Sequence, residues 1–428
     1  MTLWASSSAG LRADDGQLPI VPPAPVVNES SSSQPLRLNF PQSAAGESML
    51  RVTPYGSLWA SLIAATSRTS PGDFTLWVPS DEAQGEGALT IDARRTRIGI
   101  DVDGPELDLL GGLSSSGQVE FDFFGEFVTE NRAGARLRQA WWDLHNDDYR
   151  FLIGQTWDVI SPLKPRMLNF SVGWAGGNIG FRRAQFRAEK YVILDQETRI
   201  ELQSSLNQDI VPDFPTDAGV RRETSDWPVL EGRVAWIHRP GHGTAPGIQI
   251  GLSGHIGETG FDFLAVGPPP LSLPPEDDAR FITWSWNLDA RLEWNRFSMQ
   301  AELFQGANLS AFLGGIGQGV CPCLRRPIHT MGGWFDLSYE IHKQLQANIG
   351  FGLEDPDDGD LLMGRSFNQF LFTNLVLEVA EGLKTGLELS YWKTKYQESR
   401  EGLIDPALLI ADAPGRAVTI EWMVRYDF

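Results

Sequence analysis

The last residues of the chain, 418–428, read VTIEWMVRYDF and alternate between two kinds of side chain. One set is apolar: Val418, Ile420, Trp422, Val424, Tyr426 and Phe428. The set between them is mostly polar: Thr419, Glu421, Met423, Arg425 and Asp427. A period of two is typical of a β-strand, and a long apolar face at the end of a soluble chain would favour edge-to-edge aggregation. The pattern therefore predicts a strand with one face toward lipid.

The terminal residue adds a second indication. Phe428 ends the chain with the aromatic Tyr426 two residues before it. This ending resembles the C-terminal signature that the outer-membrane assembly machinery recognises. We therefore expect that machinery and outer-membrane lipid to be partners of the chain, through Phe428 and the strand before it.

The same alternation recurs from Arg51 onward, in runs bounded by Gly, Pro, Asp and Asn. The predicted strands cover roughly 51–68, 88–102, 113–128, 134–145, 149–157, 178–190, 196–206, 229–238, 246–258, 279–294, 296–305, 328–341, 344–354, 364–379, 383–395 and 416–428. No segment has a sustained helical period. About sixteen strands, an even number, suit a closed bacterial barrel whose termini lie on one side. The sequence predicts an all-β, transmembrane antiparallel β-barrel.

The connections between these strands are alternately short and long. The short ones lie at 146–148, 294–295, 342–344 and 380–382. The long ones span 69–87, 158–177, 207–228, 259–278, 306–327 and 396–415. Outer-membrane barrels have short periplasmic turns and longer external loops, whereas a soluble β-sandwich has no reason to keep its long loops at one end.

Composition excludes several classes of protein. The net charge of -20 makes nucleic acid a poor partner, because phosphate binding needs clustered basic residues. The 42% apolar content comes without a run of about 18 uncharged apolar residues, which a membrane-spanning helix would need. A barrel strand averages to a middling hydropathy because its two faces differ. The 15 Trp residues suit the aromatic girdles of such a barrel.

The N-terminal region differs from the rest. Residues 1–10, MTLWASSSAG, have neither a basic nor an apolar signal segment, but residues 5–13 resemble the small-residue end of a signal peptide. From Asp14 to about Ser48 the chain is rich in Ser, Pro and Ala without a hydrophobic period. We expect residues 1–48 to be a flexible lead-in, following a truncated start, and residues 49–428 to form the barrel.

Several motifs resemble the DcaP-like outer-membrane porins. They are TRIGID at 96–101, GQVEFDFFG at 117–125, RLRQA at 136–140, GQTWDVISPL at 154–163 and NIGFRRAQ at 178–185. The resemblance covers roughly 95–190 by motif and the remainder by strand pattern. It implies a homotrimeric outer-membrane porin of about sixteen strands, some relatives of which pass dicarboxylates.

The connection at 158–177 follows the fifth predicted strand, where general porins fold a loop into the channel. Pro162, Pro165 and Gly173 suit an irregular path, and Trp174 is placed to pack the loop against the wall. Irregular backbone at membrane depth is tolerated only where it lines a cavity or is covered by protein. We therefore expect this loop to point inward, an outward path being the alternative.

Charged residues alternate with apolar ones on the early strands. If Ile98, Leu137 and Trp141 face lipid, their neighbours face the lumen. The predicted pore-lining residues are Arg95, Arg97, Glu120, Asp122, Arg136, Arg138, Asp158, Arg182, Arg183 and Arg187. We expect the arginines to form a basic wall facing Glu120, Asp122 and the loop that begins at Asp158, with a preference for small anions. The alternative is that these side chains only solvate the wall.

Enzymatic and metal sites have little support. The sequence lacks GxSxG, GxxxxGK[ST] and HExxH motifs and a Cys/His nucleophile pair. Cys321 and Cys323 have no partners at zinc spacing. We expect a porin for small hydrophilic solutes in the bacterial outer membrane, with no cofactor, metal or catalytic residue. The alternatives are a soluble or surface carbohydrate-binding β-protein and an outer-membrane barrel enzyme.

Overall fold

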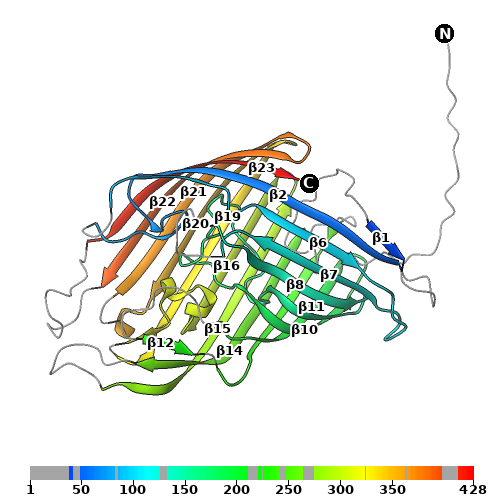
Figure 1. Cartoon of the computed structure of the whole chain (residues 1–428), viewed down its shortest axis with the longest axis horizontal. Helices are drawn as coiled ribbons and strands as arrows, with labels where there is room; N and C mark the ends of the chain where they lie inside the picture. Colours follow the sequence, from blue (N-terminus) through cyan, green and yellow to red (C-terminus); the bar gives the residue numbers. More distant parts are fainter. Residues whose placement is uncertain are drawn as a thin grey trace, which may run out of the picture.

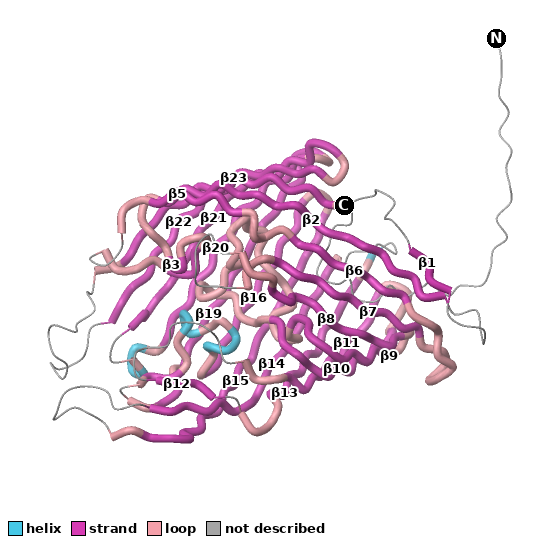
Figure 2. Tube along the Cα trace, viewed as in Figure 1, coloured by secondary structure: helices cyan, strands magenta, loops and turns pink. Residues whose placement is uncertain are grey.

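The computed structural model is one large β-barrel with tilted strands (Figure 1). It describes residues 38–41, 49–81, 85–125, 133–210, 220–223, 225–240, 247–263, 274–322, 324–361, 364–397 and 413–428. Strands account for nearly all of the wall, and helix is confined to short turns (Figure 2). These single turns are η2 (Ser310–Phe312), η3 (Gly315–Gly317) and η4 (Asp358–Asp360). In the described part of the chain, no helix is long and apolar enough to cross a membrane.

Within the described residues the wall is a closed antiparallel barrel of 16 strands, as the sequence predicts. In chain order they are β2 (Met49–Ala65), β5 (Ala88–Asp92) continued by β6 (Arg97–Asp103), β7 (Ser114–Asp122), β8 (Arg136–His145), β9 (Tyr149–Trp157), β10 (Arg182–Ile193), β11 (Thr198–Asn207), β13 (Val229–His238), β14 (Ile248–Phe263), β15 (Glu276–Trp294), β16 (Phe297–Ala307), β19 (His329–His342), β20 (Leu345–Pro356), β21 (Gly364–Ala380), β22 (Leu383–Gln397) and β23 (Gly415–Asp427). Short additional strands are β1 (Leu38–Pro41), β3 (Ser70–Pro71), β4 (Thr75–Trp77), β12 (Val220–Glu223), β17 (Val320–Cys321) and β18 (Arg326–Pro327).

The barrel closes where the first wall strand meets the last. β2 pairs with β23 from Ser57 opposite Asp427 to Ala65 opposite Thr419. Beyond the strand, Gly56 and Phe428 exchange two backbone hydrogen bonds of 3.0 and 3.1 Å. A Cβ at Gly56 would lie 2.7 Å from the Phe428 ring, so the close approach requires glycine. The C-terminus and β1 lie at the same end of the barrel (Figure 1).

The outer surface of the wall is apolar and the inner surface is polar. On β23, Ile420 and Trp422 are 47% and 51% exposed, whereas Glu421 between them is buried. The alternation that the sequence predicts for 418–428 is confirmed. Other strands repeat it, for example with exposed Leu252 on β14 next to buried Ser253. A closed wall has no unpaired edge, so an apolar outer face of this kind suits a bilayer.

The predicted strand boundaries hold closely in most of the wall. The intervals 149–157 and 229–238 coincide with β9 and β13. The predicted strand 88–102 is split, because residues 93–96 leave the ladder: the side chain of Asp92 accepts a 2.7 Å hydrogen bond from the Arg94 amide. Within the expected lead-in, β1 pairs with β2. The remainder of residues 1–48 lies outside the described residues.

One predicted orientation is wrong. Trp141 was expected to face lipid, but Trp142 is the exposed residue, at 52%. β8 contains a bulge: Glu120 pairs with Gln139 and Phe121 with Leu137, which leaves Arg138 as an extra residue. Because one extra residue reverses the alternation beyond it, Trp141 shares the inner side with Asp143, and the Arg150 guanidinium lies 5.2 Å from its ring.

The wall is much lower on one side than on the other. β7, β8 and β9 have 9, 10 and 9 residues, whereas β14, β15 and β21 have 16, 19 and 17. With a rise of about 3.4 Å per residue and a tilt of about 40°, nine residues span roughly 23 Å. That is slightly less than the apolar band of about 25 Å in such barrels. The low side is β7–β9, and the tall side includes β14 and β15.

Lysine substitutions on one strand test the membrane-facing surface. Leu375 and Val379 are both exposed on β21, and Val379 lies next to the turn at 381–382. We expect Leu375→Lys to destabilise the inserted barrel by about 2–4 kcal/mol and Val379→Lys by about 0–1 kcal/mol, because the cost depends on depth. Unfolding of the two variants in lipid vesicles measures the difference. Equal effects at both positions would contradict the proposed orientation.

Candidate functional site

Three connections fold against the inner face of the wall: residues 158–181, which we call the inward loop, and the segments 69–81 and 308–322. Each contributes fully buried apolar side chains, among them Ile160 of the inward loop, Val78 and Phe312. Side chains on the inner face of the wall form hydrogen bonds with these segments. The prediction that the connection after β9 points inward is confirmed.

Carboxylates of the wall hold the backbone of the inward loop. The amide of Val159 donates to Glu231 of β13 at 2.9 Å. The amide of Leu163 donates to Glu302 of β16 at 2.8 Å, and that of Arg166 to Asp336 of β19 at 2.7 Å. The amide of Leu168 donates to Glu388 of β22. We call Glu231, Glu302, Asp336 and Glu388 the anchor carboxylates. They guide the loop along the inner wall from β13 to β22.

Close backbone contact fixes the far end of the loop. Gly177 has φ +119°, and a Cβ there would lie 2.2 Å from the Gly333 carbonyl oxygen of β19. The segment 308–322 is held in the same manner as the loop, because the amides of Gly315 and Ile316 donate to Glu354 of β20. Only a glycine at 177 allows the loop to lie this close to the wall.

Apolar and amide contacts join the inward loop to the segment 69–81. Phe170 stacks on Phe124 with ring centroids 4.0 Å apart and meets Phe74 edge-on at 5.0 Å. The side-chain amide of Asn169 forms two hydrogen bonds with the backbone of Thr75: it accepts from the Thr75 amide at 3.2 Å and donates to the Thr75 carbonyl at 2.9 Å. Trp174, which the sequence predicts to pack the loop, is 2% exposed in this cluster. The two segments therefore form one packed unit inside the barrel.

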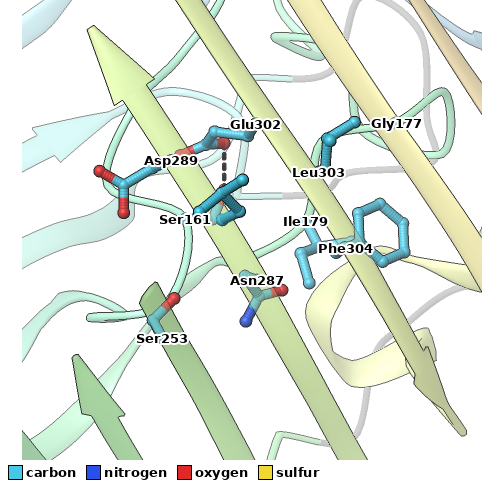
Figure 3. A pocket seen from close by; sticks show the side chains of 10 residues that line it. Ser161, Gly177, Ile179, Ser253, Asn287, Asp289, Glu302, Leu303 and Phe304 are labelled. Carbon is cyan, nitrogen blue, oxygen red and sulfur yellow. Dashed lines mark hydrogen bonds between the residues drawn. The ribbon is translucent and has the colours of Figure 1, made fainter. Parts of the chain in front are cut away.

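A small pocket lies between the inward loop and the tall side of the wall (Figure 3). Its lining includes Ser161, Asn287, Asp289 and Glu302. Ser161 donates to Glu302 at 2.7 Å, the contact drawn in Figure 3. Glu302 also accepts from the Trp334 indole at 3.0 Å. Of the acceptors that line the pocket, Glu302 thus already holds the loop, and Asp289 is paired with Arg233 of β13.

Most of the predicted pore-lining arginines are paired with polar side chains on the inner face of the wall. Arg136 forms a two-bond contact with Asp122, at 3.0 and 2.6 Å. Arg138 bridges Glu120 and Asp122, each at 2.7 Å. Glu120 and Asp122 therefore lie within the arginine cluster. The predicted arrangement, in which a basic wall faces Glu120 and Asp122, is wrong for these two residues, because β7 and β8 are adjacent strands.

The other predicted residues fall into two groups. Arg95 pairs with Glu421 at 3.2 Å, and Arg187 with Gln185 at 2.8 Å. Arg183 forms two hydrogen bonds with Asp158, of 2.7 and 3.0 Å. These side chains fix strands and loop to one another. Arg97 and Arg182, by contrast, have no hydrogen-bond or ion-pair partner in the described part of the chain.

Sequence reasoning did not single out Lys164 of the inward loop. Its Nζ lies 2.8 Å from the centroid of the Trp157 ring. The guanidinium carbon of Arg182 lies 4.4 Å from the same ring, because Arg182 pairs with Trp157 across β9 and β10. Lys164 sits between Pro162 and Pro165 in a stretch without periodicity, so the sequence carries no signal of its orientation.

No group of three or more His, Cys, Asp or Glu side chains suited to a metal occurs among the described residues. Cys321 is buried and not in a disulfide. Cys323 lies outside the described residues.

Solved structures share the architecture. DcaP, an outer-membrane channel of Acinetobacter baumannii, matches with a TM-score of 0.67 and 17% identity over 91% of this chain and 99% of that one. An anion-selective porin from Comamonas acidovorans matches with 0.52 and 14%, over 89% and 100%. The chain has the porin fold. A trimer form of OmpT, an outer-membrane protein of Vibrio cholerae, matches with 0.50 and 10%, over 89% and 99%. No family model and no curated protein sequence matches the chain.

The resemblance to DcaP-like porins that the sequence motifs indicate is thus confirmed for the fold. At these identities the similarity concerns the course of the backbone and the barrel architecture. What the lumen does depends on this chain's own side chains.

Removal of one anchor carboxylate tests how the loop is held. Glu302→Ala leaves the Leu163 amide and the Trp334 indole without their acceptor and removes one of the two acceptors near the Ser161 hydroxyl. We expect a loss of about 3 kcal/mol or more, since each unsatisfied buried donor costs about 1–3 kcal/mol. The temperature at which the protein changes from folded to unfolded migration on gels measures this loss of stability. Glu293→Ala, which removes a carboxylate that pairs with Arg291 near the turn after β15, is the matched control, and an equal loss there would contradict the anchoring role.

Proposed function

We propose that the protein is a porin of the bacterial outer membrane that lets small hydrophilic solutes diffuse passively across it. The observation that carries this proposal is a closed barrel, apolar outside and polar inside, with an irregular loop held against its inner wall. Loop backbone at membrane depth needs acceptors and a water-filled or protein-lined surrounding. The anchor carboxylates supply the acceptors, and the polar lining supports an aqueous path.

The proposed selectivity is for small anions. The anchor carboxylates are engaged by backbone amides of the loop, so their charge is partly offset and covered from the lumen. Next to the low side, on β6, the inward loop and β10, Arg97, Lys164 and Arg182 form no ion pair with a carboxylate of the described residues. A permeating ion senses charge within about 8 Å at physiological salt, so this local excess of positive charge outweighs the net charge of -20 of the whole chain. The anion-selective Comamonas porin supports the idea that this fold suits such a function.

The proposed role involves no catalysis. The anchor carboxylates are not free for acid-base work, because each accepts a hydrogen bond from the backbone of the loop. The arginines near them pair with neighbouring carboxylates or line the path. This arrangement favours a channel over the barrel enzyme and over the carbohydrate-binding protein that the sequence leaves as alternatives.

We infer a homotrimer that associates through the low side of the wall. β7, β8 and β9 barely span the apolar band, so lipid would have to thin around them. Their outer face carries Phe121, Trp142 and Ile153, which are 41%, 52% and 48% exposed. A second copy of the chain would cover this face and continue the apolar belt. The trimer form reported for OmpT of Vibrio cholerae supports this arrangement. Assembly is proposed to begin with recognition of Phe428 by the outer-membrane machinery.

A reversal potential across a KCl gradient tests the anion preference. We expect chloride to be favoured in the unmodified channel, and the double variant Arg97→Gln with Lys164→Gln to move the potential toward that of a cation-preferring pore. Arg136→Gln with Asp122→Asn should change it less, because this pair of substitutions removes one positive and one negative charge and keeps the net charge of the wall. A cation preference in the unmodified channel would refute the selectivity, leaving the pore itself intact.

The mass of the detergent-purified protein tests the trimer. We expect about three times the chain mass of 47.4 kDa. Trp142→Glu on the low side should release monomers, because it places a charge in the proposed subunit contact. Leu252→Glu, at a residue 59% exposed on the tall side, should leave the mass of the assembled protein unchanged. A monodisperse monomer for the unmodified protein would reject the trimer.

A further inference from the structure

Two basic side chains face each other on the outer surface of the barrel, on β22 and β23. Lys393 lies directly opposite Arg416 in the ladder. Arg416 is exposed and Lys393 is partly exposed. Four residues away along each strand, Leu389 and Ile420 form another opposed pair, 49% and 47% exposed on the apolar surface of the wall. Because residues two and four apart share one face of a strand, Lys393 and Arg416 are on the outer face and not in the lumen.

The depth of this pair in the membrane follows from the length of β23. Tyr426, near the C-terminal end of the strand, and Arg416 are both on the outer face and ten residues apart. With a rise of about 3.4 Å per residue and a tilt of about 40°, this interval spans roughly 26 Å, close to the apolar band of about 25 Å. The ends of β22 and β23 that carry the pair lie away from the C-terminus (Figure 1). Lys393 and Arg416 are therefore level with the lipid headgroups at the external end.

The described part of the protein gives this pair no counter-charge. No carboxylate of the described residues forms an ion pair with Lys393 or Arg416. Like charges directly opposite each other on neighbouring strands are destabilising. A membrane surface that carries anionic headgroups attracts basic residues at this level. The pair is thus placed to receive its counter-charge from outside the protein.

Other basic residues of the outer surface are compensated within the protein. Arg280, exposed on β15, has Asp226 and Asp278 each at 3.8 Å. Lys395, two residues beyond Lys393 on β22, acts electrostatically on Asp355 of β20. Two unpaired cations in direct opposition therefore distinguish the place where Lys393 meets Arg416.

We infer that Lys393 and Arg416 bind the phosphate group of a lipid in the external leaflet. The guanidinium of Arg416 presents a planar fork of donors that fits two phosphate oxygens, and the Lys393 ammonium adds a point charge. On the membrane side of the pair, Tyr391 lies opposite Val418, so acyl chains attached to the phosphate contact the apolar wall. A soluble phosphate ion would gain no such contact. The site is independent of what passes through the lumen.

A lipid held at this place joins the last two strands of the wall. β23 closes the barrel against β2, and a phosphate shared by Lys393 and Arg416 links β23 to β22 at the external end. A ligand that binds only the folded form stabilises it by mass action. We therefore expect the bound lipid to raise the temperature at which the barrel unfolds.

Binding of fluorescently labelled lipid A, a glycolipid that carries phosphates, to the detergent-purified protein tests the site. We expect saturable binding, and weak binding of the same lipid without its phosphates. The dissociation constant should rise roughly fivefold in Lys393→Gln and in Arg416→Gln, because each basic residue near an anionic headgroup contributes about that factor, and by a larger factor in the double variant. Arg280→Gln is the control: it removes the same charge where carboxylates compensate it, and should leave the constant unchanged.

Stability and competition give two further readouts. Lipid A should raise the temperature at which the unmodified protein changes from folded to unfolded migration on gels, and should not raise it in the double variant. If inorganic phosphate displaces the labelled lipid as well as unlabelled lipid A does, the assignment to a lipid is overturned. Equal binding of the lipid without phosphates also overturns the inference. Equal weakening by Arg280→Gln overturns it as well, since the effect would then reduce to overall charge.

Discussion

Hydrogen bonds from the backbone of the inward loop to carboxylates of the wall are the interactions on which the interior of this barrel depends. A loop that is neither helix nor sheet carries amide groups that must find acceptors. Strand backbone cannot provide them, since its own groups are used in the ladder. Carboxylates can, because one side chain serves two or more donors with bonds stronger than neutral ones. Glu302 illustrates this with the Leu163 amide, the Ser161 hydroxyl and the Trp334 indole.

These anchors also separate charge across the lumen. The anchor carboxylates stand on β13, β16, β19 and β22, and the arginine cluster stands on β6, β8 and β10. The backbone amides of the loop bind the acidic side, whereas its side chains Phe170 and Lys164 lie at the basic side, near Arg136 and Trp157. The bulge at Arg138 contributes, since it places Arg136 and Arg138 on the inner side while turning Trp141 inward beyond them.

The wall of the barrel could be predicted from the sequence because each of its strands repeats a pattern of period two. Trp422 outward and Glu421 inward follow from alternation alone, and β9 and β13 were bounded by their turns. The bulge could not be predicted, because a single extra residue leaves no mark in a run as polar as RLRQA. The register of β7 against β8 was needed to see that Glu120 and Asp122 pair with arginines beside them.

The interior segments were less predictable for a different reason. Pro162, Pro165 and Trp174 indicated an irregular and packed loop, and that expectation held. The orientation of Lys164 depends on Trp157 and on contacts to β16 and β19, which are far away in the sequence. No local pattern encodes such contacts. Arg182 and Arg183 look alike in the sequence, and only the structure shows that Arg183 binds Asp158 while Arg182 has no hydrogen-bond or ion-pair partner among the described residues.

The seam between Gly56 and Phe428 has a consequence for how the chain reaches its final state. Every wall strand except the two at the seam has both of its neighbours close in sequence, whereas β2 and β23 each have one such neighbour and meet each other across almost the whole chain. Until they join, both present a row of unpaired amides and carbonyls that a hydrocarbon medium cannot satisfy. Intermediates with an open cylinder are therefore unfavourable in lipid, and the final pairing is a non-local and slow event. The barrel must therefore close in one concerted step. A chain that lacks β2 or β23 cannot form this seam, and no partly closed form of it is stable in lipid.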